Sequence, residues 1–329
     1  MKITDKKTGS LTIELTMEIE AADYAPIEKK KVAERRRNAE FKGFRKGMVP
    51  ESLVRRVYGD QILADTVNHV VGEGLDNYIK SNSLKVLGEP IASENQPENT
   101  WESGQDFKFV FDIALQPEVK VAVEKADTVV KYEISASAKD KAAMVENLKM
   151  FYEGRKEEKS AEDIETEVTG RLASEYAQES EWRLSKDIRD YFVKKAAVEL
   201  PEDFLRRWLL QANEGKVSAE DVEKEFPGFI EDFRWQMVRG TLMKEWGFKV
   251  EDKDVQEAAE AYVAYQYAMY GMGNVPAEIL KESVQNVLTD RRQVERLIEQ
   301  VEDRKVMDKI RSEITLKSKK ITSEKFREL

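Results

Sequence analysis

The strongest constraint on the fold is a change in hydrophobic periodicity along the chain. Residues 10–20 and 107–115 alternate apolar and polar side chains, which is the pattern of half-buried β-strands. From about residue 138 onward the apolar side chains instead recur every three to four residues, as they do along one face of a helix. Helical patterns also lie between the two strands. We therefore predict an α+β protein, with a small N-terminal α+β domain followed by an elongated and mostly α-helical domain.

Three segments follow from this pattern. We place the first domain at residues 1–117, an extended and valine-rich linker at 118–137, and the helical domain at 138–329. Within the helical domain, the segment 153–167 is almost entirely polar. It predicts a break between two helices, with Ser160 as the N-cap of the second.

Composition excludes several classes of protein. The 329 residues include no Cys and a single His, His69, so disulfides, thiol catalysis, Cys-ligated metals and a Ser–His triad are not expected. No phosphate-binding or dinucleotide-binding glycine motif is present, and we predict no catalytic residues, no metal site and no cofactor. No apolar run is long enough to span a bilayer, and the N-terminus lacks the apolar core of a signal peptide. We expect a cytoplasmic protein without a membrane partner.

The charge of the chain is unevenly distributed. The net charge is −10, yet the segment 29–56 holds eleven basic residues against three acidic ones and therefore carries +8. The rest of the chain carries −18. A basic segment on an acidic protein indicates one surface for an anionic partner, although a solvated helix face is the commoner explanation of such a charge run.

A loop in the middle of this basic segment stands out. Two glycines flank an aromatic and two basic side chains, and a proline follows at a position suited to the first turn of a helix. Arg and Lys can reach phosphates, and Phe can stack or enter an apolar crevice. A docking loop for RNA or a ribonucleoprotein and a plain basic turn fit these residues equally well. The candidate residues are Gly43, Phe44, Arg45, Lys46, Gly47 and Pro50.

This loop resembles the ribosome-binding signature of the bacterial trigger factor family, chaperones that bind at the nascent-chain exit tunnel. The resemblance extends along nearly the whole chain, through Leu87-Gly88-Glu89-Pro90, Val198-Glu199-Leu200-Pro201-Glu202 and the Bacteroidetes-like segment Tyr270-Gly271-Met272-x-Asn274-Val275-Pro276. It implies an ATP-independent chaperone that docks on the large ribosomal subunit, contacting protein and rRNA near the tunnel. It also implies that nascent and unfolded polypeptides are partners, and that the free chain forms a weak homodimer.

One departure from the family concerns the peptidyl-prolyl isomerase domain that its members usually carry. Such a domain needs about 100 residues, whereas the polar segment 153–167 offers neither the length nor a strand pattern. We expect this domain to be absent, and with it the isomerase activity.

The helical half is rich in Trp, Tyr and Met, side chains that suit promiscuous apolar contacts. Ordinary helix packing explains any one of them nearly as well. As a client-binding set we predict Trp208, Trp235, Met237, Tyr262, Tyr265, Met269 and Met272. The alternative function is a regulatory module that binds RNA or the ribosome and uses the helical half as a dimerisation platform.

Overall fold

The N-terminal part of the chain forms a four-stranded antiparallel sheet. The strands are β1 (Lys2–Lys7), β2 (Thr12–Ile19), β3 (Ile91–Ala92) and β4 (Phe107–Ala114), and their order in the sheet is β1-β2-β4-β3. The strands predicted at 10–20 and 107–115 are confirmed as β2 and β4, which pair with each other. Strand β1 was not predicted, because it holds a single apolar residue, Ile3, and all its other side chains are exposed.

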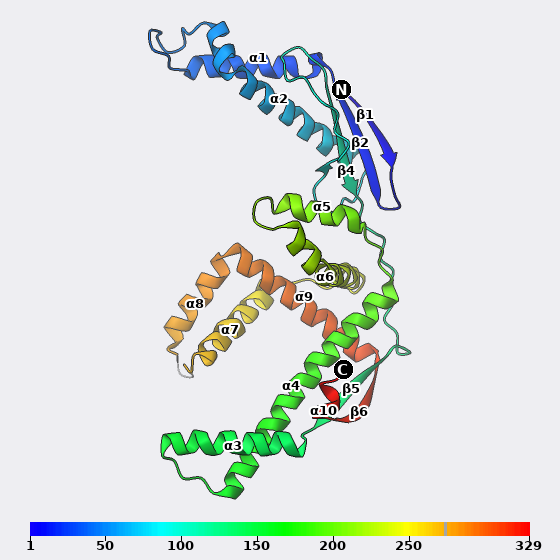
Figure 1. Ribbon diagram of the computed structural model, residues 1–329, viewed down its shortest axis with the longest axis vertical. Coiled ribbons are helices and arrows are strands. Elements are labelled where there is room, and N and C mark those ends of the chain that lie inside the picture. Colours follow the sequence, from blue (N-terminus) through cyan, green and yellow to red (C-terminus); the bar gives the residue numbers. More distant parts are fainter. Residues whose placement is uncertain (273–274) are drawn as a thin grey trace. The chain divides into compact units, whose positions relative to one another are not determined.

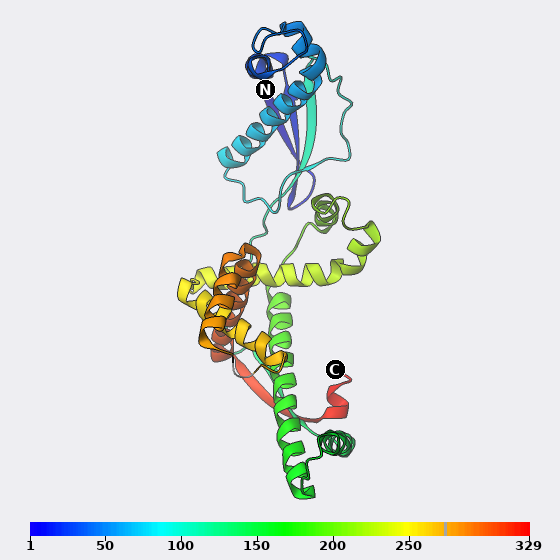
Figure 2. The same cartoon turned by 90° about the vertical axis from the view of Figure 1, so that its left-hand side faces the viewer.

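Two helices complete this part, α1 (Ala21–Asn38) and α2 (Glu51–Ser81). The inward-facing residues of β2, among them Leu15 and Met17, pack with Leu63 and Val67 of α2 in one buried cluster. Figures 1 and 2 show α2 lying along one face of the sheet. The N-terminal part of α2, with Val54 and Ile62, packs with Val32 of α1 in a separate small cluster that lies beside the candidate loop.

The remainder is mainly helical, as the periodicity predicted. Strand β5 (Thr128–Ser135) pairs in parallel with β6 (Thr315–Thr322), although 179 residues separate the end of one from the start of the other. The helices are α3 (Ala138–Arg155), α4 (Ala161–Ala196), α5 (Glu202–Ala212), α6 (Ala219–Glu245), α7 (Asp252–Met269), α8 (Ala277–Thr289), α9 (Arg291–Glu313) and α10 (Ser323–Phe326). The α+β fold class is thereby confirmed.

The computed structural model describes residues 1–272 and 275–329. Asn274 of the family-like segment lies outside the described residues. The chain divides into two compact units, one of residues 1–118 and 199–230 and the other of residues 119–198 and 231–329. Our sequence-based domains are instead continuous segments of the chain, 1–117, 118–137 and 138–329, and these limits remain a proposal. Among the described residues, no helix is both long and apolar enough to cross a membrane.

The polar segment 153–167 contains the predicted helix break. Helix α3 ends at Arg155, Lys156 adopts a left-handed φ of 57°, and the Ser160 hydroxyl accepts a hydrogen bond of 3.1 Å from the backbone N–H of Asp163. Ser160 is thus the N-cap of α4, as predicted. Residues 156–160 alone join α3 to α4, so no further domain is inserted at this point.

Candidate functional site

The candidate loop consists of two consecutive tight turns. The backbone N–H of Phe44 donates to the carbonyl of Phe41 at 3.0 Å, and that of Met48 donates to the carbonyl of Arg45 at 2.9 Å. Gly43 and Gly47 occupy the third position of the first and second turn, with φ of 92° and 82°. A positive φ at this position favours glycine, because a Cβ there would clash with the backbone. The two glycines therefore determine the path of the loop.

The base of the loop is fixed by packing. Val49 is fully buried against Val32 and Val54, which come from α1 and α2. The Nε of Arg36 donates to the carbonyl of Val49 at 2.7 Å. On the other side of the loop, the ring of Phe41 meets the ring of Tyr58 edge-on at a centroid distance of 6.0 Å.

The tip of the loop, residues 44–48, faces solvent. The side chains of Phe44 and Met48 are 44% and 68% exposed, and Arg45 and Lys46 are also exposed. Lys46 lies 4.0 Å from the carboxylate of Glu40, at the limit of an ion pair and between two solvated side chains, so this contact holds it weakly. The loop brings the predicted Phe44, Arg45 and Lys46 together, with Pro50 directly before α2. Sequence reasoning missed Met48, whose only signal was a place beside the second glycine.

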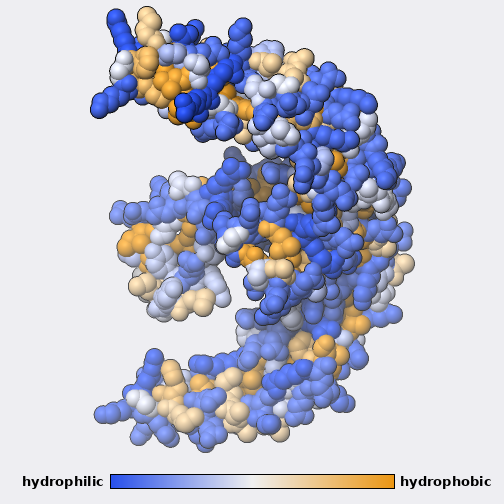
Figure 3. Space-filling model, turned by 45° about the horizontal axis from the view of Figure 1, so that its top comes forward, coloured by the Kyte–Doolittle hydropathy of each residue, from blue (hydrophilic) through white to orange (hydrophobic). Residues whose placement is uncertain are grey.

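The predicted client residues fall into two groups. Tyr265, Met269 and Met272 are 65%, 71% and 56% exposed at or just beyond the C-terminal end of α7, and Tyr270, which was not in the predicted set, is 84% exposed between Met269 and Met272. Tyr262 is half-buried, and its hydroxyl accepts a hydrogen bond of 2.6 Å from Gln266. Figure 3 shows apolar patches among a mostly hydrophilic surface on the face that it presents.

The remaining client residues pack within the protein. Trp235 is only 2% exposed, and its indole N–H donates to the carboxylate of Asp303 at 2.5 Å. The prediction that Trp235 contacts clients is therefore wrong for this structure, because the residue belongs to the core. Met237 is half-buried. Trp208 is half-buried too, and its indole stands so close to Gly88 that a Cβ there would lie 2.9 Å from the Trp208 Nε1.

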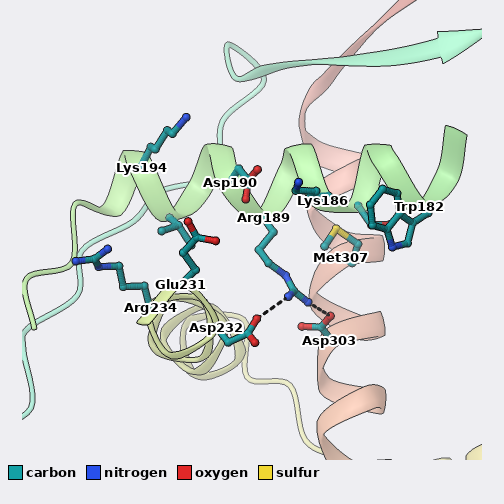
Figure 4. Close-up of a pocket in the computed structure, with 12 residues that line it drawn as sticks. Trp182, Lys186, Arg189, Asp190, Lys194, Glu231, Asp232, Arg234, Asp303 and Met307 are labelled. Atoms are coloured by element: carbon teal, nitrogen blue, oxygen red, sulfur yellow. Dashed lines mark hydrogen bonds and ion pairs between the residues drawn. The ribbon is translucent and has the colours of Figure 1, made fainter. Parts of the chain in front are cut away.

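A groove that the sequence did not indicate lies where α4, α6 and α9 meet (Figure 4). Arg189 of α4 crosses it and pairs with Asp232 at 3.2 Å and with Asp303 at 3.3 Å. Trp182 stands at one end, 66% exposed, near Met307. Little in the sequence indicated that Trp182 lines a groove, since this residue lies off the apolar stripe of α4. The groove offers apolar contact beside charged groups of both signs.

Comparison with known proteins decides the family. The model described as "Bacterial trigger factor protein (TF)" matches residues 1–148, and the one described as "Probable trigger factor, C-terminal domain" matches residues 180–329. The chain belongs to the trigger factor family. The first match is to the N-terminal region of trigger factors and the second to their C-terminal region. Only residues 149–179 lie between the two matches.

Individual trigger factors match over part of their length. The trigger factor of Citrifermentans bemidjiense is 34% identical over 121 residues, which are 37% of this chain and 27% of that protein. The trigger factor of Francisella tularensis subsp. novicida is 25% identical over 169 residues, 51% of this chain and 37% of that protein. The chain thus matches well under half the length of these curated relatives.

A solved structure of the trigger factor chaperone has the same fold. The two structures superpose with a TM-score of 0.55 at 14% sequence identity. The superposition covers 95% of this chain and 100% of the solved chain. At this level of identity the likeness concerns the fold alone.

Proposed function

We propose that this chain is an ATP-independent chaperone that docks at the ribosomal exit tunnel and shields nascent or unfolded polypeptides. The observation that carries the proposal is the loop 43–50, in which a fixed base presents Phe44, Arg45 and Lys46 to solvent within a segment of net charge +8. Membership of the trigger factor family supports the same reading. A cytoplasmic location accords with this role.

The docking partner is the large ribosomal subunit, through protein and rRNA near the tunnel. Arg45 can donate to phosphate oxygens through a planar guanidinium, and Lys46 supplies a second positive charge. Phe44 and Met48 add apolar contact at the same tip. Binding that includes phosphate contacts weakens as salt is added, because the counterions that binding releases gain less entropy in a more concentrated salt solution.

Ribosome co-sedimentation of the triple variant Phe44→Ala, Arg45→Ala, Lys46→Ala tests this assignment. We expect loss of binding, with the fold intact because substitutions on exposed loops change stability by about 0.5 kcal/mol or less. The matched control replaces Lys6 and Lys7, exposed basic residues of β1, with Ala and should bind like the wild type. Undiminished binding by the triple variant would refute the loop as the docking site.

Client binding belongs to the helical half in this proposal. The exposed side chains at the end of α7 and the groove beside Trp182 offer separate apolar contacts among charged residues. Weak contacts of this kind can hold an unfolded chain without trapping it. Suppression of aggregation of an unfolded protein without ATP is the test, and the triple loop variant should retain it. A regulatory module that binds only RNA or the ribosome would not suppress aggregation.

The proposal includes no prolyl isomerase activity. The five residues that join α3 to α4 leave no place there for the sheet-based domain that carries this activity in the family. A protease-coupled assay on a Pro-containing peptide should show no acceleration over buffer. Off the ribosome we propose a weak homodimer, which sedimentation over a concentration series would detect.

A further inference from the structure

Strand β6 has one edge bonded to β5 and one open edge. The N–H of Thr315 donates to the carbonyl of Asp127 at 2.9 Å, and the carbonyl of Ile321 accepts from the Ser135 hydroxyl at 3.3 Å. The main-chain groups of these two residues therefore point toward β5. Because successive residues of a strand direct their main-chain groups to opposite sides, those of Leu316, Ser318 and Lys320 point away from it. Across residues 1–272 and 275–329, the sheet gives them no partner strand.

The other strand of the pair does not offer such an edge. The carbonyl of Tyr132 on the outer side of β5 accepts a hydrogen bond from the Ser180 hydroxyl of α4. Figure 1 shows α4 running beside β5. In this two-stranded sheet the outer edge of β6, unlike that of β5, is open to a third strand.

The open strand is also positively charged. β6 holds Lys317, Lys319 and Lys320 and no acidic residue, which gives it +3 in a chain of net −10. All three side chains are exposed, and within the described part of the chain none has a carboxylate close enough for an ion pair. Lysines on an edge strand oppose pairing with a second copy, because like charges would face each other. They favour an acidic partner instead.

We propose that the open edge of β6 binds an extended, acidic segment of an unfolded polypeptide, which joins β5 and β6 as a third strand. Main-chain hydrogen bonds would supply contacts that do not depend on client sequence. The three lysines would add a preference for Asp and Glu. This inference rests on the proposed chaperone function and adds to it a class of client that the apolar patches would not hold.

The test uses a fluorescent acidic peptide of alternating Thr and Glu with the eight-residue length of β6. Anisotropy should show binding that weakens at least about tenfold when two adjacent central residues are N-methylated, because this blocks both edges of the peptide. Replacing Glu with Lys in the peptide should weaken binding to a similar degree. Equal binding of the N-methylated peptide would overturn strand addition.

Variants of β6 locate the site. Ser318→Pro removes an outward N–H at an edge position where proline is tolerated, and Ser318→Ala is the matched control that keeps it. We expect the proline variant to bind at least about tenfold more weakly and the alanine variant to bind like the wild type. Lys317→Gln, Lys319→Gln, Lys320→Gln keeps the backbone, so it carries the test if the proline variant fails to fold. Wild-type peptide binding by this triple variant would refute the site.

Two further measurements distinguish the proposed β6 site from the general chaperone function and from self-association. Aggregation suppression by the same variants reports on the chaperone proposal, so a variant that keeps suppression and peptide binding refutes the β6 site alone. Sedimentation over a concentration series reports on self-association. A homodimer that Ser318→Pro abolishes and Ser318→Ala keeps would overturn the proposal in favour of a second copy at this edge.

Discussion

The Nε of Arg36 donates a hydrogen bond of 2.7 Å to the carbonyl oxygen of Val49. Arg36 lies in the last turn of α1 and Val49 shortly before α2, so the bond closes the loop between the two helices. The side chain of Val49 is buried in the cluster that joins these helices. The exposed tip therefore stands on a fixed base, so the proposed docking would require little additional ordering of the loop.

Val49→Ala tests the importance of that base. Removing two buried carbon atoms should lower the free energy of unfolding by about 2 kcal/mol through lost burial and a residual cavity. We also expect weaker ribosome binding, since the tip would lose its fixed position. Denaturant unfolding and co-sedimentation measure the two effects. Val57→Ala is the control, because Val57 is exposed on α2 and its truncation should change neither.

Replacing the loop glycines should also destabilise the loop, but through backbone strain rather than lost packing. Gly43→Ala and Gly47→Ala meet no neighbouring atom within 4 Å, so any effect comes from their positive φ. Each should cost about 1 kcal/mol or redirect the turn, and ribosome binding should fall.

Gly72→Ala is the matched control for these two variants. Gly72 lies in the interior of α2, also with nothing within 4 Å and without a positive φ. There alanine should stabilise the protein by up to about 1 kcal/mol. Equal responses of Gly43, Gly47 and Gly72 to alanine would contradict the turn geometry.

The loop illustrates what the sequence could predict. Gly43 and Gly47 interrupt both periodicities, so the turn and its exposed tip were predictable. The burial of Val49 was not, because it depends on Val32 and Val54, which are distant in the sequence. For the same reason the burial of Trp235 was not predicted. Its helical spacing from other apolar residues fits a position in the core or in a groove equally well.

The pairing of β5 with β6 is a second example. Both segments are extended in the structure, and the linker that contains β5 was predicted to be so. Nothing in either segment specifies the partner, because the alternation of side chains describes one strand and not its neighbour. The open edge of β6 became visible only with that pairing.

Acid should weaken the junction of α3 and α10. The Ser323 hydroxyl, and with it that of Ser137, holds the pKa of the Asp140 carboxyl well below its usual range. Both terminal nitrogens of the Arg327 guanidinium also donate to Asp140, at 3.1 Å. A carboxyl whose pKa is lower in the folded state stabilises that state above its unfolded pKa of about 3.9, and this contribution is lost as the pH falls toward the folded pKa.

Asp140→Asn should therefore lower the free energy of unfolding at pH 7 by about 1 kcal/mol or more, because a helix-capping carboxylate is lost. The difference from wild type should shrink below about pH 4, where the Asp140 carboxyl is protonated in the unfolded state but still ionised in the folded state. Denaturant unfolding between pH 3 and about pH 7 measures it. Glu146→Gln, an exposed change on the same helix, is the control. A constant difference across this range would contradict the role of the charge.

Trp235→Phe should behave as a core substitution. The variant removes the hydrogen bond to Asp303 and part of the buried volume of the indole, at a cost of about 1 to 3 kcal/mol. Trp182→Phe, on an exposed side chain, should stay within about 0.5 kcal/mol of the wild type. Thermal unfolding separates them. Client crosslinks to a probe at position 235 in the folded protein would instead indicate that the core opens.

The end of α7 should show the opposite pattern, with little effect on stability and a large one on clients. Tyr265 and Met269 are exposed, so Tyr265→Ser with Met269→Ser should leave the free energy of unfolding within about 1 kcal/mol of wild type. Aggregation suppression should fall, because apolar contact with clients is lost, and the heat-capacity change of client binding should become less negative. Glu257→Ser with Glu260→Ser, earlier on the same helix, removes exposed charges without apolar area and is the matched control. If the Tyr265 and Met269 variant suppresses aggregation as well as the control does, clients bind elsewhere, and the groove beside Trp182 becomes the next surface to test.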